Sequence, residues 1–141
     1  AGGQYLDLNY ERKKIKKNKI VDMQIKKTGK LFAFCCIAPA VIANKKVNVL
    51  RFFEKIGLEI GLLFQITDDL IDYKGTSKKA GKKTKKDEKK GKATLISLLG
   101  YKNTIKYNNK IKNNILNKIK YYKNKSKNLK ETVLFIFERE K

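Results

Sequence analysis

The sequence predicts an all-α protein. Apolar residues recur three and four positions apart over most of the 141 residues, which places them on one face of successive helices. No segment alternates apolar and polar residues with the two-residue period of a strand, and no β-hairpin signal occurs. A hydrophobic content of 41% is enough to bury a core in a chain of this length. We therefore expect one helical domain.

The first long helix is predicted after a Gly-rich entry at residues 1–10. Its apolar side begins with Ile20 and Met23, includes Lys27, and continues through the apolar run 31–43. Pro39 should end or bend this helix near its last two turns, because proline lacks the backbone donor that a helix interior needs.

The run 31–43 has 13 residues, whereas a membrane-spanning helix needs roughly 20. It therefore predicts a buried helix and no stable membrane insertion. Two cysteines in this run, Cys35 and Cys36, are adjacent and cannot link distant parts of the chain, which favours a reducing, cytoplasmic setting. Because the chain begins with Ala1, we expect it to be part of a longer protein.

A second helix is predicted over residues 47–72, where apolar residues follow helical spacing almost throughout. Gly57 and Gly61 lie four positions apart, so they form a smooth strip that another helix could approach closely. Residues 73–92 contain ten lysines, three glycines and no large aliphatic residue, which predicts a loop or short turns. Three further helical segments follow, at 94–99, 105–122 and 129–138.

The net charge of +22 is typical of proteins that bind nucleic acid, anionic membranes or phosphorylated ligands. However, 32 of the 35 basic residues are lysine, and the chain is also rich in asparagine and isoleucine. That composition is typical of A/T-rich codons, so the charge alone does not identify a ligand. The absence of histidine excludes a Ser-His-Asp triad, a Cys-His nucleophile pair and most zinc or haem sites.

Three of the six aspartates, Asp68, Asp69 and Asp72, fall within five residues of the second predicted helix. Asp68 and Asp72 lie one turn apart on a face that Gln65 extends. Mutual repulsion and the negative end of the helix dipole would both oppose this cluster. A hard cation such as Mg²⁺, which takes carboxylate, water and phosphate oxygens, would compensate it. The alternative is pairing with surface lysines, but the apolar neighbours favour carboxylates that project from a mostly buried helix.

Lysines beside glycines suggest contacts with phosphate. Gly81-Lys82 and Gly91-Lys92 are ten residues apart; glycine lets the backbone approach an anion, and lysine supplies a compact charge. This pairing is weak evidence alone and does not have P-loop spacing. Lys27-Thr28-Gly29 places a glycine inside a helix and a lysine on its apolar side, which calls for a reason beyond an ordinary surface turn.

Together these segments resemble the trans-isoprenyl diphosphate synthases, such as farnesyl and geranylgeranyl diphosphate synthases. The resemblance covers nearly the whole chain and rests on motifs in the family's order and spacing: Gly2-Gly3-Gln4 with Leu6-Asp7-Leu8, Lys27-Thr28-Gly29, the segment 64–72, and Gly81-Lys82 through Gly91-Lys92-Ala93-Thr94. It implies the isoprenoid synthase fold, with antiparallel helices around a central cavity. Residues 1–141 would be the C-terminal part of that domain, and 73–92 an active-site loop.

The resemblance also implies substrates and roles. Family members join an allylic diphosphate to isopentenyl diphosphate with Mg²⁺, usually as homodimers. Asp68, Asp69 and Asp72 match the second Asp-rich, metal-binding motif. The other matched residues are diphosphate-binding lysines, Lys27 and Lys82 with Lys92 on the same loop, and polar groups near the developing cation, Thr28 and Gln65.

The first Asp-rich motif of the family is missing from this sequence, so we expect this part alone to be inactive. The resemblance favours a farnesyl diphosphate synthase, and leaves open a geranylgeranyl or longer-chain synthase and a non-catalytic synthase subunit. A basic nucleic-acid-binding module is a separate alternative, suggested by the tyrosines among the lysines: Tyr101, Tyr107, Tyr121 and Tyr122. We expect no nucleic acid among the partners.

Overall fold

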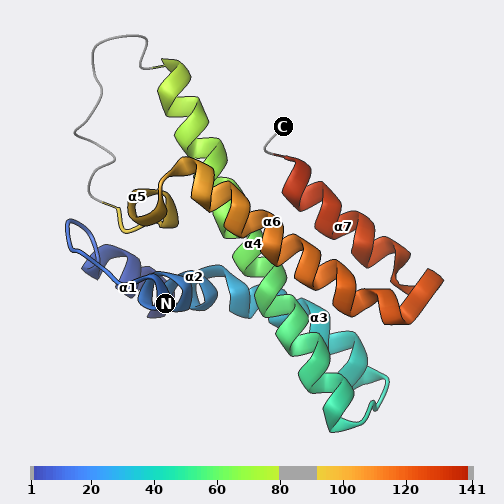
Figure 1. The fold of residues 1–141 in the computed structure, drawn as a ribbon. Coiled ribbons are helices and arrows are strands. Elements are labelled where there is room, and N and C mark those ends of the chain that lie inside the picture. The colour runs from blue at the N-terminus through green and yellow to red at the C-terminus, as the bar shows by residue number, and fades with distance from the viewer. Residues whose placement is uncertain (1, 80–91, 140–141) are drawn as a thin grey trace.

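The computed structural model describes residues 2–79 and 92–139, with side chains omitted over 76–79 (Figure 1). Their helices follow the chain in this order: α1 (Gly2–Asn9), α2 (Lys17–Gln24), the π-helix η1 (Ile25–Gly29), α3 (Lys30–Ile42), α4 (Val47–Lys79), α5 (Leu95–Leu99), α6 (Tyr101–Ile119), the 3₁₀-helix η2 (Lys120–Ser126) and α7 (Lys127–Glu138).

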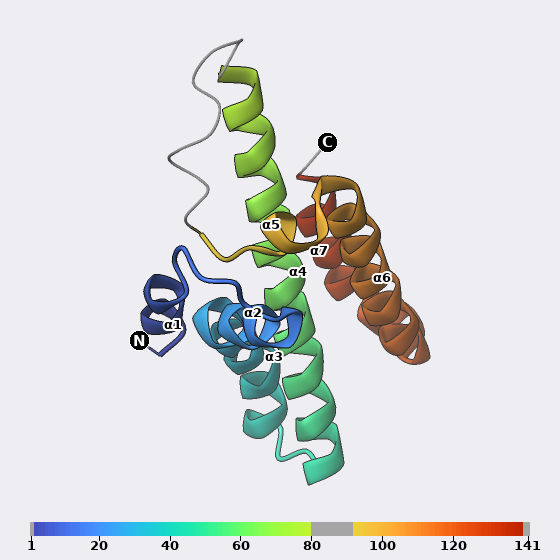
Figure 2. The same cartoon turned by 60° about the vertical axis from the view of Figure 1, so that its left-hand side comes forward.

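Helix α4 runs through the middle of the molecule; in Figure 2, α1, α2 and α3 lie to one side of it and α6 and α7 to the other. Its neighbours α3 and α6 are both antiparallel to it. The core is built around α4, because five of its apolar side chains are at most 2% exposed: Ile56, Ile60, Leu63, Ile66 and Leu70.

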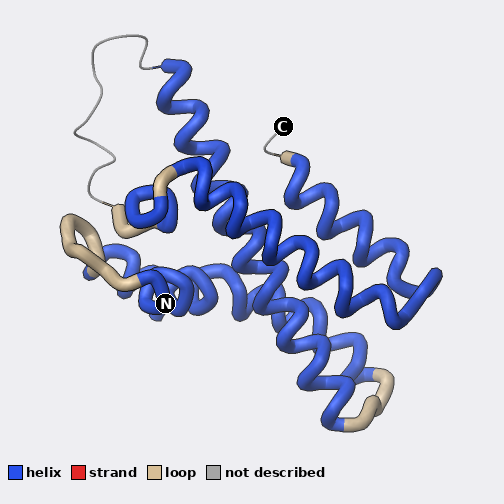
Figure 3. The backbone as a smooth tube through the Cα atoms, viewed as in Figure 1, coloured by secondary structure: helices blue, strands red, loops and turns tan. Residues whose placement is uncertain are grey.

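The described residues contain no strand (Figure 3), and the predicted all-α class is confirmed. Among these residues, no helix is both long enough and apolar enough to cross a membrane. Cys35 and Cys36 are both free thiols.

The predicted first helix is present but is not uniform. α2, η1 and α3 form one helical run in which Lys27, Thr28 and Gly29 belong to the π-helical segment. Pro39 lies inside α3, which ends three residues later at Ile42, in agreement with the prediction. The Gly-rich entry is itself a helix, α1.

The predicted close approach at the glycine strip is also confirmed. A Cβ atom on Gly57 would lie 2.5 Å from the Cα atom of Ala33, and one on Gly61 would lie 2.5 Å from the Cα atom of Gly29. Since neither separation leaves room for a methyl group, the two glycines set the spacing between α4 and the η1–α3 segment.

The loop predicted over 73–92 is wrong for residues 73–79, which continue α4; residues 80–91 lie outside the described part. The extension has a tertiary cause, because Tyr73 stacks on Tyr101 of α6 with ring centroids 5.2 Å apart. The aspartates therefore lie inside α4, and the predicted penalty from a helix C-terminus does not apply.

The last helices follow the predicted order. Thr94 caps α5 through a reciprocal capping box with Ser97, which satisfies two backbone donors at the helix start. Gly100, at φ 79°, separates α5 from α6, and this positive φ is the conformation that glycine adopts without a steric penalty.

Candidate active site

A polar pocket of about 340 Å³ lies where α1, the α2–η1 junction, α4 and the start of α5 meet. It brings together most of the residues predicted for the site. Its lining includes Lys27, Gln65, Asp68, Asp69, Asp72 and Lys92, together with Asp7, Met23, Gln24, Ile71, Ala93 and Thr94.

The three α4 carboxylates have different surroundings. Asp68 accepts a hydrogen bond at Oδ1 from Nη2 of Arg139, at 3.0 Å. Asp69 accepts two, from Nε2 of Gln24 at 2.9 Å and from Nε2 of Gln65 at 3.2 Å. Asp72 is exposed at the edge of the pocket. The three carboxylates thus line one pocket but differ in how far they are buried.

Burial acts most strongly on Asp69. Desolvation raises its pKa to about 6, against the lowering effects of the Gln65 hydrogen bond and the charge of Lys27. Neighbouring Asp7 and Asp68 raise the pKa further. A cation bound beside Asp69 would stabilise its ionised form, because a positive charge would offset the cost of burying the carboxylate.

Thr28 joins the same polar network. Its Oγ1 donates to Oε1 of Gln65 at 2.9 Å, and Gln65 donates in turn to Asp69. The π-helical turn at Ile25–Gly29 inserts an extra residue into the helical repeat and so turns the side chains that follow. This local geometry places Thr28 against α4 and Lys27 at the pocket.

Lys27 is held by α1. Its Nζ lies 2.6 Å from Oδ2 of Asp7. The ion pair requires α1 to sit close to η1, and Gly3 permits this because any Cβ atom there would overlap the backbone of Lys27. The Gly-Gly-Gln segment therefore has a packing role beside the pocket.

The remaining predicted lysines differ in what the structure describes. Lys92 is exposed and lines the pocket. Lys82 lies outside the described residues, so its role stays a prediction.

The donor set fits Mg²⁺ as part of a site. Among the described residues, no group of three or more Asp, Glu, His or Cys side chains is arranged to hold a metal ion alone. Mg²⁺ in phosphate-handling sites commonly takes one or two carboxylates and completes its ligands with water and phosphate oxygens. A pocket that holds Asp68, Asp69 and Asp72 beside two lysines offers that combination.

The sequence alone assigned no role to Asp7, Gln24 or Arg139. Their partners are distant in sequence: Asp7 pairs with Lys27, Gln24 with Asp69, and Arg139 with Asp68. Periodicity links residues within one helix and gives no signal for contacts between helices.

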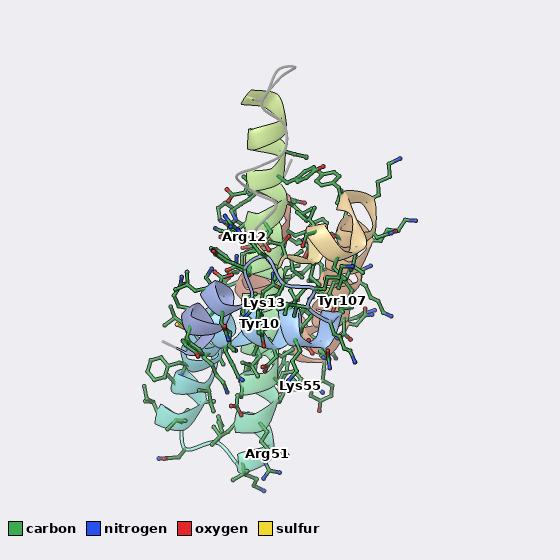
Figure 4. The ribbon with its side chains drawn as sticks, turned by 90° about the vertical axis from the view of Figure 1, so that its left-hand side faces the viewer. Tyr10, Arg12, Lys13, Arg51, Lys55 and Tyr107 are labelled. Atoms are coloured by element: carbon green, nitrogen blue, oxygen red, sulfur yellow. The ribbon has the colours of Figure 1, made fainter. Side chains whose placement is uncertain are left out.

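Basic side chains and tyrosines also share one face of the molecule, where Arg12, Lys13, Lys55 and Arg51 are spread around Tyr10 and Tyr107 (Figure 4). Both tyrosines are partly buried against the core. The Tyr107 ring is also covered by Nζ of Lys17, 3.8 Å from its centroid. Neither Tyr10 nor Tyr107 therefore offers the fully exposed ring that stacks on single-stranded nucleic acid, whereas Tyr121 is 84% exposed.

Known proteins resemble this chain in sequence and in fold. The family described as polyprenyl synthetase matches residues 1–133. The chain belongs to this family. A farnesyl diphosphate synthase of Micrococcus luteus is 31% identical over 139 residues, which cover 99% of this chain and 48% of that protein. A geranylgeranyl diphosphate synthase of Cyanophora paradoxa is 34% identical over 140 residues, with coverages of 99% and 47%.

Similarity to solved structures confirms the isoprenoid synthase fold. The geranyltransferase from Helicobacter pylori complexed with magnesium and isoprenyl diphosphate has a TM-score of 0.75 and 26% identity, covering 97% of this chain and 45% of that chain. This chain thus spans about half the length of the curated relatives it matches.

Proposed function

We propose that this chain supplies one wall of the active site of a trans-prenyltransferase, which extends an allylic diphosphate by the five carbons of isopentenyl diphosphate. The observation that supports this most directly is the convergence of Asp68, Asp69, Asp72, Lys27 and Lys92 on one pocket. Oxygen ligands for a divalent cation and ammonium groups for phosphate oxygens are the two requirements for binding a diphosphate ester.

In the proposed reaction the C–O bond between the allylic carbon and its diphosphate breaks. The double bond of isopentenyl diphosphate attacks the allylic carbon, and transfer of one proton to the departing pyrophosphate leaves a new double bond in the product. Mg²⁺, held by the α4 carboxylates, would supply positive charge to the departing pyrophosphate. Lys27 and Lys92 would bind its oxygens, with Asp7 keeping the Lys27 ammonium at the pocket.

Thr28 and Gln65 would act on the other side of the reaction. The Thr28 hydroxyl donates to Gln65, so the lone pairs of its oxygen remain available to face positive charge. Oxygen dipoles fixed by such a network can stabilise an allylic cation without reorganising as the charge develops.

The product that we favour is farnesyl diphosphate. Synthases of farnesyl and of geranylgeranyl diphosphate both match the chain, so the relatives alone do not distinguish these two products. We further propose that the complete protein acts as a cytoplasmic homodimer, of which this chain is the C-terminal part. Sedimentation of the purified gene product would test the assembly, and product chromatography the chain length.

The test of the reaction is turnover of isopentenyl diphosphate by the complete gene product with Mg²⁺. Asp68→Ala should reduce turnover by orders of magnitude. Asp22→Ala is the matched control, because Asp22 of α2 pairs with Lys26 of η1 and does not line the pocket. Unchanged turnover in Asp68→Ala would contradict the proposed function.

A further inference from the structure

Arg139, just after α7, reaches the carboxylate to which we assign metal binding. It makes one hydrogen bond to Asp68, from Nη2 to Oδ1 at 3.0 Å. The two side chains are only 26% and 40% exposed. The guanidinium carbon lies 4.2 Å from the ring centroid of Phe64, one turn earlier on α4. Asp68 therefore has a cationic partner within the chain itself.

Arg139 uses only part of its hydrogen-bonding capacity in this pair. The fork of arginine can pair with a carboxylate through two parallel hydrogen bonds, but Arg139 makes a single one to Asp68. Its Nε atom is buried and has no hydrogen-bond partner. The guanidinium thus neutralises the Asp68 carboxylate but leaves some of its own donors unused. A cation that binds the carboxylate more strongly can therefore replace it.

The position of Arg139 is tied to the docking of α7. The backbone N–H of Arg139 donates to Phe135, which continues the last turn of the helix. Ile136, one turn earlier, and Val133, two turns earlier, are buried in the core, and Phe137 packs against it. Apolar burial therefore anchors α7 through its last turn, and Arg139, the residue that follows the helix, is held to α4 by its contacts with Asp68 and Phe64.

We propose that Arg139 is the resident countercation of Asp68 and that a divalent cation displaces it, so that metal loading releases Arg139, the residue that follows α7, from α4. The reason is electrostatic: a guanidinium and a divalent ion that share one carboxylate repel each other at short range. This inference rests on the proposed function, because it takes Asp68 as a metal ligand. By linkage, whatever strengthens the Arg139–Asp68 pair weakens metal binding by the same factor.

The experiment measures Mg²⁺ binding to the complete gene product by calorimetry, in the presence of inorganic pyrophosphate. Arg139→Gln should tighten Mg²⁺ binding about two- to fivefold, the factor that corresponds to a partly exposed ion pair. Arg139→Lys keeps the charge but loses the planar contact with Phe64, and should give a smaller gain.

The matched control is Lys112→Gln. The Nζ of Lys112 lies 4.3 Å from the ring centroid of Phe137, so this change removes one positive charge and one cation–π contact near α7 without touching Asp68. It should leave Mg²⁺ affinity within the error of the wild type. In an Asp68→Asn background, Arg139→Gln should have no further effect on Mg²⁺ affinity.

Hydrogen exchange supplies the second readout. Mg²⁺ with pyrophosphate should speed exchange of the Arg139 amide, which donates to Phe135, in the wild type, and Asp68→Asn should show the faster exchange of this amide without metal. Weaker or unchanged Mg²⁺ binding in Arg139→Gln, or exchange that metal does not alter, would overturn the inference. If instead Asp68→Asn leaves Mg²⁺ binding unchanged, it is the metal role of Asp68, and with it the proposed function, that fails.

Discussion

Asp69 is the residue on which the electrostatics of the pocket act most strongly. Its pKa rises from 3.8 to about 6 in the folded chain, chiefly through burial. Between these two values the folded chain holds a proton that the unfolded chain has released. The free energy of unfolding should therefore fall as pH rises from about 4 to about 6, by at most about 3 kcal/mol, and remain lower above that range.

Asp69→Asn should remove this pH dependence and be more stable than the wild type at pH 8, since the amide carries no charge to desolvate. Urea unfolding at pH 4.5 and pH 8 measures both quantities. Asp72→Asn removes the same charge from an exposed position of the same helix and should retain the wild-type slope. If the free energy of unfolding of Asp69→Asn and of the wild type depended on pH in the same way, the raised pKa of Asp69 would be contradicted.

The Asp7–Lys27 ion pair gives a second prediction for single residues. Asp7→Asn should weaken pyrophosphate binding in the presence of Mg²⁺ by about two- to fivefold, because Lys27 loses the partner that holds it at the pocket. Asp22→Asn breaks the Asp22–Lys26 pair, at 2.9 Å, and serves as the control. Equal affinities in the two variants would show that Asp7 does not position Lys27.

At the level of elements, the spacing between α4 and the η1–α3 segment determines the pocket. Thr28 reaches Gln65 only because the backbones meet at Gly29 and Gly61, where an added Cβ would lie 2.5 Å from a Cα atom. The π-helical turn and the glycine strip thus act together: the first turns the side chains, and the second brings them within hydrogen-bonding distance.

Gly61→Ala should therefore destabilise the chain by about 1–3 kcal/mol, the cost of forcing a methyl group into a filled contact. Gly75→Ala is the opposite case on the same helix, since a Cβ there meets nothing within 4 Å. It should stabilise the chain by up to about 1 kcal/mol through helix propensity. Thermal or urea unfolding of the two variants checks both signs, and a gain in stability from Gly61→Ala would contradict the close approach.

At the scale of the whole molecule, several large apolar side chains of α3 are exposed to solvent. Leu31 and Phe34 are each 66% exposed, and Ile42 is 83% exposed. Contiguous exposed apolar surface promotes association. We expect this chain, expressed alone, to self-associate as its concentration rises, and Phe34→Lys to shift it toward monomer in analytical ultracentrifugation. Lys106→Glu, an exposed change on α6, is the control, and a wild-type chain that stays monomeric would contradict the expectation.

The antiparallel packing of α4 and α6 shows which contacts hold the molecule together. Pairs along the two helices run in opposite order: Tyr73 stacks on Tyr101, Thr67 accepts from Asn108, and Glu59 pairs with Lys118. These residues are 28 to 59 positions apart. Each contact depends on a register that no local pattern encodes.

The sequence alone determined the helical class, the extent of the apolar faces, the glycine strip and the clustering of aspartates, because each of these depends on spacing within one helix. It also placed Lys27 and Thr28 near those aspartates, through the resemblance to the family. Only the tertiary structure decided that α4 continues past Asp72, that Asp7 forms an ion pair with Lys27, and that Arg139 forms an ion pair with Asp68. Those outcomes depend on side chains that become neighbours only when helices pack, and periodicity within one helix carries no information about such pairs.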